Sequence, residues 1–198
     1  MIDFNIAGFR FRFSWSSGII KAKQHLGPQL RAFEQASDAT PDVQVYIEEE
    51  APAEIKALER LPVICEGRLG EQTLWSLRQN DSAYIIGTYR HSSDSAPHHI
   101  LLANRDFTRF TISPAAPITA SSPPESLVSF PLLSLMLYYQ TTVHDAIYLH
   151  GSAVIDKGSA RIFTAKSGVG KTTMARTWQQ HGYPLINDDR LMLRLTDD

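Results

Sequence analysis

The segment from Phe163 to Thr173 constrains the fold of this chain more than any other feature. It reads Phe-Thr-Ala-Lys-Ser-Gly-Val-Gly-Lys-Thr-Thr, with glycines at positions 168 and 170. Because glycine has no Cβ, the backbone here can curl with its N–H groups turned inward. A lysine and a hydroxyl residue directly after such a turn can neutralise phosphate and ligate Mg²⁺, as in a Gly-x-Gly-Lys-Ser/Thr phosphate loop. The segment therefore predicts a site for a nucleoside triphosphate.

The residues on both sides of the loop fit this interpretation. Residues 160–164 are rich in β-forming types, and after the loop Met174, Ala175 and Trp178 fall on one helical face until Gly182 offers a stop. The start of that helix would add its positive end to the site. Ala165 departs from the usual pattern, which has a glycine there, and is tolerated if φ is negative. A Gly/Ser-rich connection without a ligand is the alternative.

Two adjacent carboxylates, Asp188 and Asp189, end an apolar run that begins at Tyr183. Ligands collect at the carboxyl ends of strands in open α/β sheets, so we expect the pair near the loop. In phosphoryl transfer one carboxylate can accept the proton of the attacking hydroxyl while the other holds Mg²⁺. The alternative is a turn or a solvated acidic corner.

A second β-rich run, residues 146–156, precedes the loop and contains His150. Residues 156–158, Asp-Lys-Gly, form a turn signal, so this run and residues 160–164 are predicted to make a hairpin. A single histidine in an apolar strand is more often a hydrogen-bonded structural residue than a catalytic one. Its position next to the loop and the carboxylates favours the functional interpretation.

Taken in order, the blocks 150–154, 165–173 and 185–190 and the intervals between them resemble the catalytic core of the HPr kinase/phosphorylase family, a relative of phosphoenolpyruvate carboxykinase. In that family ATP with Mg²⁺ phosphorylates a protein serine, and inorganic phosphate supports the reverse reaction. The preceding part of the chain looks more like the kinase A-type relatives of HPr kinase. Some of these act beside peptide-modification genes, so the implied partner is an HPr-like protein or a modified-peptide precursor.

The resemblance implies a role for each matching residue. Asp188 would activate the serine hydroxyl, His150 would lie near the transferred phosphate, and Lys171 would contact the phosphates. Thr172 and Asp189 would lie at Mg²⁺. The implied nucleotide-binding set is Ala165, Lys166, Ser167, Gly168, Val169, Gly170, Lys171, Thr172 and Thr173.

The implied fold class is α/β, with a P-loop nucleotide-binding core behind a β-rich N-terminal domain. We expect the β-rich domain over residues 1–114, a Pro/Ser linker over 115–125 and the core over 126–198. A family member would continue with further strands and a substrate-binding loop, so we expect a truncated or naturally shortened core. The nucleotide-binding residues are present whether the core is truncated or naturally shortened. Phosphoryl transfer to a substrate would depend on the further strands and the substrate-binding loop.

Strand patterns in the first part support the β-rich interpretation. We expect strands at 9–15, 42–48, 73–77, 82–89, 99–102 and 107–112. Helices are expected at 29–35, at 53–60 and within 125–144. His91, His98 and His99 are interpreted as residues of a solvated loop, since no cysteine or carboxylate spacing supports a metal site.

Composition narrows the class of protein. The 198 residues are 43% hydrophobic and 20% charged, which allows a buried core. The net charge of −2 and the scattered basic residues argue against a nucleic-acid partner. The apolar run 130–139 is shorter than the roughly 20 residues that cross a bilayer, and the N-terminus has no signal-peptide core. Single Cys65 is expected as a small buried thiol in a reducing compartment, which predicts a cytoplasmic protein.

The leading hypothesis is therefore an ATP-dependent serine kinase related to HPr kinase/phosphorylase. Two alternatives remain: a non-catalytic nucleotide-binding or interaction module, and a small-molecule or carboxykinase-like phosphotransferase. The family suggests a homo-oligomer, although no heptad or other pattern supports one.

Overall fold

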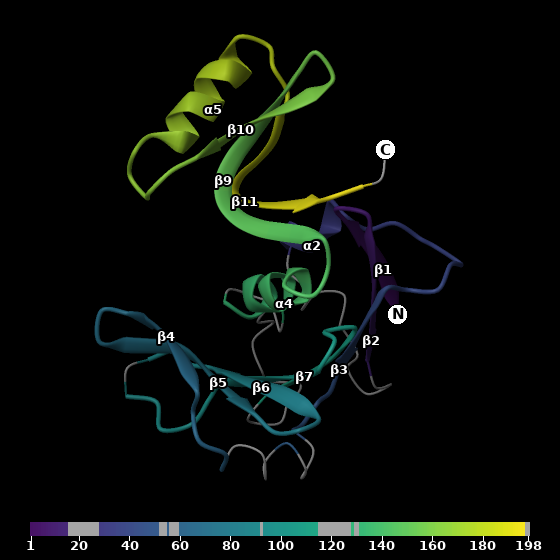
Figure 1. The fold of residues 1–198 in the computed structure, drawn as a ribbon, viewed down its shortest axis with the longest axis vertical. Helices are drawn as coiled ribbons and strands as arrows, with labels where there is room; N and C mark the ends of the chain where they lie inside the picture. The colour runs from purple at the N-terminus through teal and green to yellow at the C-terminus, as the bar shows by residue number, and fades with distance from the viewer. Residues whose placement is uncertain are drawn as a thin grey trace. The chain divides into compact units, whose positions relative to one another are not determined.

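The computed structural model describes residues 1–15, 28–51, 55, 60–91, 93–114, 128 and 131–196, without the side chains of Pro28 and Gln29. The chain divides into two compact units, Met1–Val143 and His144–Asp198. Figure 1 shows the elements of each unit. The expected linker, residues 115–125, lies outside the described residues, and the division between units falls after Val143.

The first unit is built on an eight-stranded sheet with the order β1-β2-β3-β8-β7-β6-β5-β4. Strand β3 pairs in parallel with β2 and with β8, and the other neighbours pair antiparallel. The strands are β1 (Ile2–Ile6), β2 (Phe9–Trp15), β3 (Val43–Ile47), β4 (Cys65–Leu69), β5 (Gln72–Gln79), β6 (Ala83–Thr88), β7 (His99–Asn104) and β8 (Arg109–Pro114).

Alternation along β2 places one face of this sheet in the core. Phe9, Phe11 and Phe13 are buried, whereas Arg10 and Arg12 lie between them and point to the other face. The Arg12 guanidinium pairs with Asp3 across the β1–β2 hairpin at 2.8 Å. The expected strand at 9–15 is confirmed by β2, and those at 42–48, 73–77, 82–89, 99–102 and 107–112 are confirmed by β3 and β5 to β8. Strands β1 and β4 were not expected.

Two helices of the first unit are described. Helix α4 (Leu132–Thr141) lies over the sheet in Figure 1, with Leu132 and Met136 buried. The Tyr139 ring stacks on Phe107, with the centroids 5.7 Å apart, which ties the helix to the sheet. Helix α2 (Pro28–Arg31) is shorter than the expected helix at 29–35, and most of the expected helix at 53–60 lies outside the described residues.

The second unit is a three-stranded sheet with one described helix. Strand β9 (Ala146–Asp156) is central, with β10 (Ser159–Thr164) on one side and β11 (Leu185–Arg194) on the other, both antiparallel to it. Lys157 and Gly158 join β9 to β10 at φ 50° and 79°, as in a type I′ turn, which confirms the expected hairpin. Helix α5 (Lys171–Gln180) connects β10 to β11 and packs Trp178 against Phe163 of β10.

The expected fold class, an α/β P-loop core behind a β-rich domain, is wrong. The described chain is mostly β, and its second unit has no row of adjacent parallel strands, because β9 separates β10 from β11. The acidic pair also does not end a strand, since β11 continues past Asp188 and Asp189 to Arg194.

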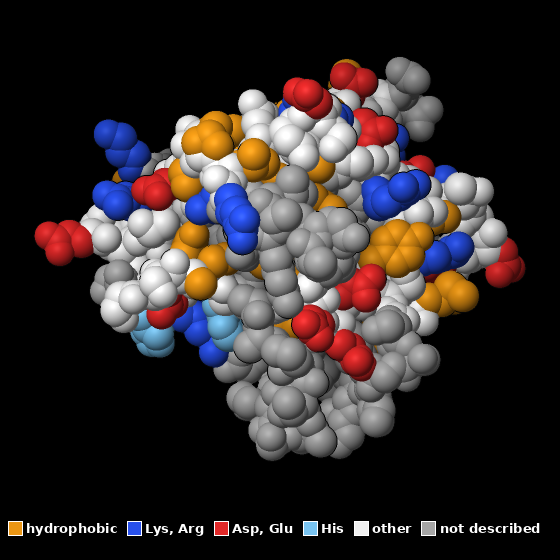
Figure 2. Space-filling view, turned by 90° about the horizontal axis from the view of Figure 1, so that it is seen from below, with side chains coloured by type: hydrophobic (Ala, Val, Ile, Leu, Met, Phe, Trp, Pro, Cys, Tyr) orange, Lys and Arg blue, Asp and Glu red, His pale blue; other side chains and the backbone are white. Residues whose placement is uncertain are grey.

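Surface features test three further expectations. Cys65, expected to be buried, is exposed at the start of β4. No helix in the described part of the chain has the length and apolar character needed to cross a membrane. On the face shown in Figure 2, the basic and acidic side chains of the described residues are interspersed.

The interpretation of the histidines as loop residues is wrong for His99. This residue begins β7, is 7% exposed, and has its ring 4.3 Å from that of His98. Burial lowers the pKa of His99 to about 4, from an ordinary value of 6.5. The folded chain therefore keeps His99 neutral at pH values where the unfolded chain protonates it.

We predict that the free energy of unfolding falls as the pH drops from 7 to 5. Unfolded His99 binds its proton near pH 6.5 and folded His99 only near pH 4, so the unfolded state binds more protons in this window. The loss attributable to His99 is about 2 kcal/mol. Urea unfolding at both pH values measures it. His99→Leu should show a smaller loss, and His91→Leu, at an exposed position, should behave like the parent. Equal losses in all three proteins would contradict the prediction.

Candidate functional site

Strand β9, which contains His150, pairs at neighbouring positions with the end of β10, where the phosphate loop begins, and with the acidic pair of β11. Gly151 pairs with Thr164, the last residue of β10, and with Asp189 of β11. Its neighbour Ser152 pairs with Phe163 and with Asp188. The phosphate loop therefore begins beside the acidic pair, although the two are far apart in sequence.

The backbone of the loop needs glycine at two positions. Gly168 and Gly170 have φ values of 82° and 103°, and a Cβ at either would meet no atom within 4 Å. Left-handed backbone, and not crowding, is therefore the reason for glycine at both. Ala165 does not have positive φ, so the condition under which alanine is tolerated there is met.

The start of α5 faces the loop without a side-chain cap. Its N-cap residue is Gly170, and no side chain accepts a hydrogen bond from the first turn. The first N–H groups of a helix have no partner within the helix and carry the positive end of its dipole. Such an end suits an anion, provided that other groups complete the site.

Lys171 lies across the loop. Its ammonium group donates to the carbonyl oxygens of Ala165, at 2.9 Å, and Lys166, at 3.1 Å. An ammonium group has three N–H donors, so one is left over for a phosphate oxygen. In this structure Ala165 and Lys166 therefore contact Lys171 through their backbone.

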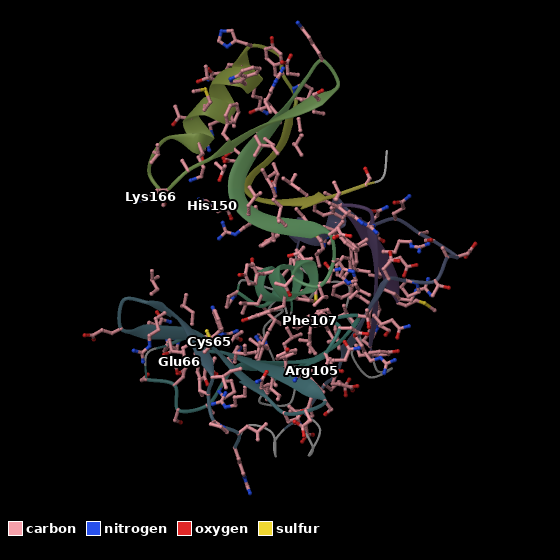
Figure 3. The ribbon with its side chains drawn as sticks, viewed as in Figure 1. Cys65, Glu66, Arg105, Phe107, His150 and Lys166 are labelled. Atoms are coloured by element: carbon pink, nitrogen blue, oxygen red, sulfur yellow. The ribbon has the colours of Figure 1, made fainter. Side chains whose placement is uncertain are left out.

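These elements enclose a pocket of about 360 Å³. This volume is in the range of small-ligand sites. The pocket is lined by His150, Ser167, Gly168, Gly170, Lys171, Thr172, Thr173, Asp188 and Asp189. Among the expected site residues Ala165, Lys166 and Val169 do not line it, and Val169 is 68% exposed. Figure 3 shows His150 and Lys166 at the same end of this unit.

Two hydroxyl groups hold Asp188. Ser152 Oγ donates to Asp188 Oδ1 at 2.5 Å, and Thr172 Oγ1 donates to the same oxygen at 2.9 Å. The bond from Ser152 is the largest effect and lowers the pKa of Asp188. Burial, the second-largest effect, raises this pKa, and Thr172, Arg176 and His150 lower it further, so that the pKa lies below its ordinary value. Asp188 is therefore a carboxylate at neutral pH, with Oδ1 occupied.

Asp189 belongs to a different group of contacts. Its Oδ1 lies 2.8 Å from Arg190 Nη1 and 3.0 Å from His150 Nδ1. The backbone of Asp189 has φ 127°, a left-handed value that is strained for a residue other than glycine. The structure thus gives two adjacent carboxylates different partners.

Ser152 and Arg190 are site residues that the sequence interpretation did not assign a role. Ser152 is two residues from His150, so an extended strand places both on one face. Arg190 directly follows the acidic pair and pairs with His150 across the strands. Ser152 could have been identified from the sequence, because alternate residues of the predicted strand share a face with His150. Arg190 could not, because its position opposite His150 depends on how β11 pairs with β9.

The oxygen ligands here suit a hard cation. In the described residues no cluster of three or more His, Cys, Asp or Glu could hold a metal ion by itself. The Thr172 hydroxyl donates a hydrogen bond to Asp188, which leaves the lone pairs of Oγ1 available. Mg²⁺ usually takes one or two protein oxygens together with nucleotide phosphates and water. Thr172 and Asp189 therefore fit Mg²⁺ that arrives with a nucleotide.

A larger pocket, of about 630 Å³, lies in the first unit. Its charged lining includes Asp3 and Arg12, which pair with each other. It contains neither a phosphate loop nor a helix start, so the smaller pocket is the candidate site.

Comparison with protein-family models, with curated proteins and with solved structures found no match. Assignment of a function therefore rests on the motif and on the geometry of the pocket.

We predict that Ser152→Ala raises the pKa of Asp188 towards its ordinary value of 3.8, because the largest cause of the depression is removed. Carbon-13 NMR titration of labelled aspartate carboxyls would measure the change. Thr172→Val should give a smaller rise. Ser159→Ala, on the exposed start of β10, serves as the control and should leave this pKa unchanged. An unaltered Asp188 titration in Ser152→Ala would rule out the proposed contact.

Proposed function

We propose that this chain binds Mg·ATP at residues 165–173 and belongs to an ATP-dependent kinase that phosphorylates a serine of a protein or peptide. The observation that carries the proposal is the pocket that combines Lys171, the uncapped start of α5, Thr172 and the acidic pair. These are the groups that phosphoryl transfer requires, namely phosphate ligands, a metal site and a carboxylate at the acceptor.

The loop would hold the triphosphate. Backbone N–H groups between Ser167 and Thr173 and the helix dipole supply partial positive charge, and Lys171 supplies a full charge. For this, Lys171 would use the donor that its two carbonyl contacts leave over, or exchange one of those contacts for phosphate.

Mg²⁺ would be held by Thr172 and Asp189. Mg²⁺ held there would supply positive charge that offsets the charge of the phosphates in the transition state. Asp188 contributes by accepting the hydrogen bond from Thr172, which orients the lone pairs of that hydroxyl away from the carboxylate.

Asp188 would also receive the acceptor hydroxyl. In the transfer step the serine oxygen bonds to the γ-phosphorus, the bond from that phosphorus to the β,γ-bridging oxygen breaks, and ADP leaves with the electron pair. The serine proton passes to Asp188, whose Oδ2 takes no part in the hydrogen bonds from Ser152 and Thr172. A lowered pKa makes Asp188 a weak base. Phosphoryl transfer tolerates this, because its loose transition state needs little charge on the attacking oxygen.

The choice of a serine acceptor is supported by the resemblance of residues 150–154, 165–173 and 185–190 to HPr kinase/phosphorylase. That resemblance supports an HPr-like protein or a modified-peptide precursor as substrate, the cytoplasm as compartment, and self-association. The single cysteine, free in this structure, agrees with a reducing compartment.

Lys171→Ala is predicted to weaken binding of Mg·ATP and Mg·ADP by roughly 10- to 100-fold, the usual loss for a hydrogen bond to a charged group. Isothermal titration calorimetry measures it. Lys157→Ala removes the same charge from the turn at the far end of β9 and should bind like the parent. If the parent takes up no nucleotide, or if Lys171→Ala binds equally well, the nucleotide site is disproved.

Transfer is tested with ATP labelled at the γ-phosphate. We expect a labelled serine in a candidate protein or peptide with the parent chain, and a loss of at least a hundredfold with Asp188→Asn, since general base catalysis contributes on the order of 10² or more. Nucleotide binding without transfer to any acceptor would indicate a non-catalytic module, and a labelled metabolite without labelled protein would indicate a small-molecule kinase.

A further inference from the structure

Arg190 lies directly opposite His150 in the pairing of β11 with β9. Its Nη1 atom is 2.6 Å from His150 Nδ1, 2.8 Å from Asp189 Oδ1 and 3.2 Å from the Asp189 carbonyl oxygen. One terminal nitrogen of the guanidinium therefore contacts the imidazole and the carboxylate together.

The shortest of these contacts constrains where the proton of the ring lies. A guanidinium has donors only, so the 2.6 Å contact is a hydrogen bond only when the imidazole Nδ1 presents a lone pair. In that arrangement one hydrogen of Nη1 goes to His150 Nδ1 and the other to the oxygens of Asp189. The neutral ring then carries its proton on Nε2.

The opposite tautomer is the alternative that Arg190 disfavours. His150 Nδ1 also lies 2.8 Å from the Asp189 carbonyl oxygen and 3.0 Å from Asp189 Oδ1, to either of which a proton on Nδ1 could be donated. The N–H group of the ring would then lie 2.6 Å, nitrogen to nitrogen, from the donors of Nη1 with no hydrogen bond between them. Without Arg190 this repulsion disappears, and the contact with Asp189 would favour the proton on Nδ1.

We propose that Arg190 is a positioning residue that fixes His150 in the Nε2–H tautomer, so that His150 meets a bound phosphate as a hydrogen-bond donor. The phosphate part of this proposal rests on the proposed function, whereas the tautomer can be observed in the nucleotide-free protein.

The tautomer decides what His150 contributes. His150 lines the pocket, and with Nδ1 turned to Arg190 its other ring nitrogen is the one left for a ligand. An N–H group at Nε2 could donate a hydrogen bond to a bound phosphate, in addition to those from Lys171 and the start of α5. A lone pair there would repel phosphate oxygens and would compete with Asp188 for the acceptor proton. Arg190 thus leaves proton acceptance to the carboxylate.

The tautomer is read by long-range ¹H–¹⁵N NMR of the nucleotide-free full chain at about pH 8.5, two pH units above the pKa of about 6.5 of a free imidazole. His150→Gln identifies the signals. We expect a pyridine-type Nδ1 and a pyrrole-type Nε2 in the parent, a shift towards Nδ1–H in Arg190→Met, and recovery in Arg190→Lys, whose ammonium group still donates. Arg194→Met makes the same change further along β11 and should keep the parent tautomer. A protonated Nδ1 in the parent would overturn the proposal even if the variant failed to fold, and so would an unchanged tautomer in folded Arg190→Met.

Calorimetry with Mg·ATP tests the contribution to phosphate binding. We expect about tenfold weaker binding for Arg190→Met, the usual loss for one hydrogen bond to a charged group, and recovery of most of it in Arg190→Lys. If the tautomer changes as expected but the affinity does not, the donor role of His150 is overturned. If the parent binds no nucleotide, the proposed function fails and the donor role fails with it, while the NMR result still decides the tautomer.

Discussion

The antiparallel pairing of β9 with both β10 and β11 is the constraint on which the candidate site depends. In a strand, a slip of one residue turns every side chain to the opposite face. The pairing of β11 with β9 shifts register between Leu185 and Asn187, so Ile186 is an extra residue. If Ile186 instead paired with Ala153 in a regular ladder, Asp188 would stand opposite Gly151 and face away from Thr172. The bulge therefore places the carboxylate opposite Ser152. The type I′ turn after Asp156, at the same end of β9, sets the pairing of β10 so that Phe163 also stands opposite Ser152.

Local signals were sufficient for much of this arrangement. The alternation of phenylalanine and arginine predicted β2, and Lys157-Gly158 has the turn chemistry that a two-residue hairpin needs. Loop and helix followed from Gly168, Gly170 and Lys171, because left-handed backbone and a charged side chain are properties of single residues. Strand β1 has the same alternation, with Asp3 and Asn5 between Ile2, Phe4 and Ile6, so its sequence did carry a strand signal. Strand β4 is largely exposed and carries none, and its pairing with β5 provides what its own residues do not.

The order of strands could not be derived in the same way. A strand, a loop, a helix and a second strand give the same local pattern whether the two strands are neighbours or have another strand between them. Here β10 and β11 do run in the same direction, since both are antiparallel to β9, but β9 lies between them. Which strands become neighbours is decided by backbone hydrogen bonds between residues that are distant in sequence. For the same reason the acidic pair was expected at a strand end, although it lies inside β11.

The two neighbouring carboxylates show how the backbone assigns different chemistry to identical side chains. Successive residues of a strand point to opposite faces, so Asp188 reaches the hydroxyls of Ser152 and Thr172. Asp189 would point away from the pocket on an ideal strand. Its φ of 127° departs from that geometry, and its carboxylate reaches His150 and Arg190. Neutral donors thus hold one carboxylate and a cation holds the other. The strain at Asp189 is the cost of bringing both carboxylates into one pocket, and the guanidinium contact on its carbonyl and carboxylate oxygens offsets part of that cost.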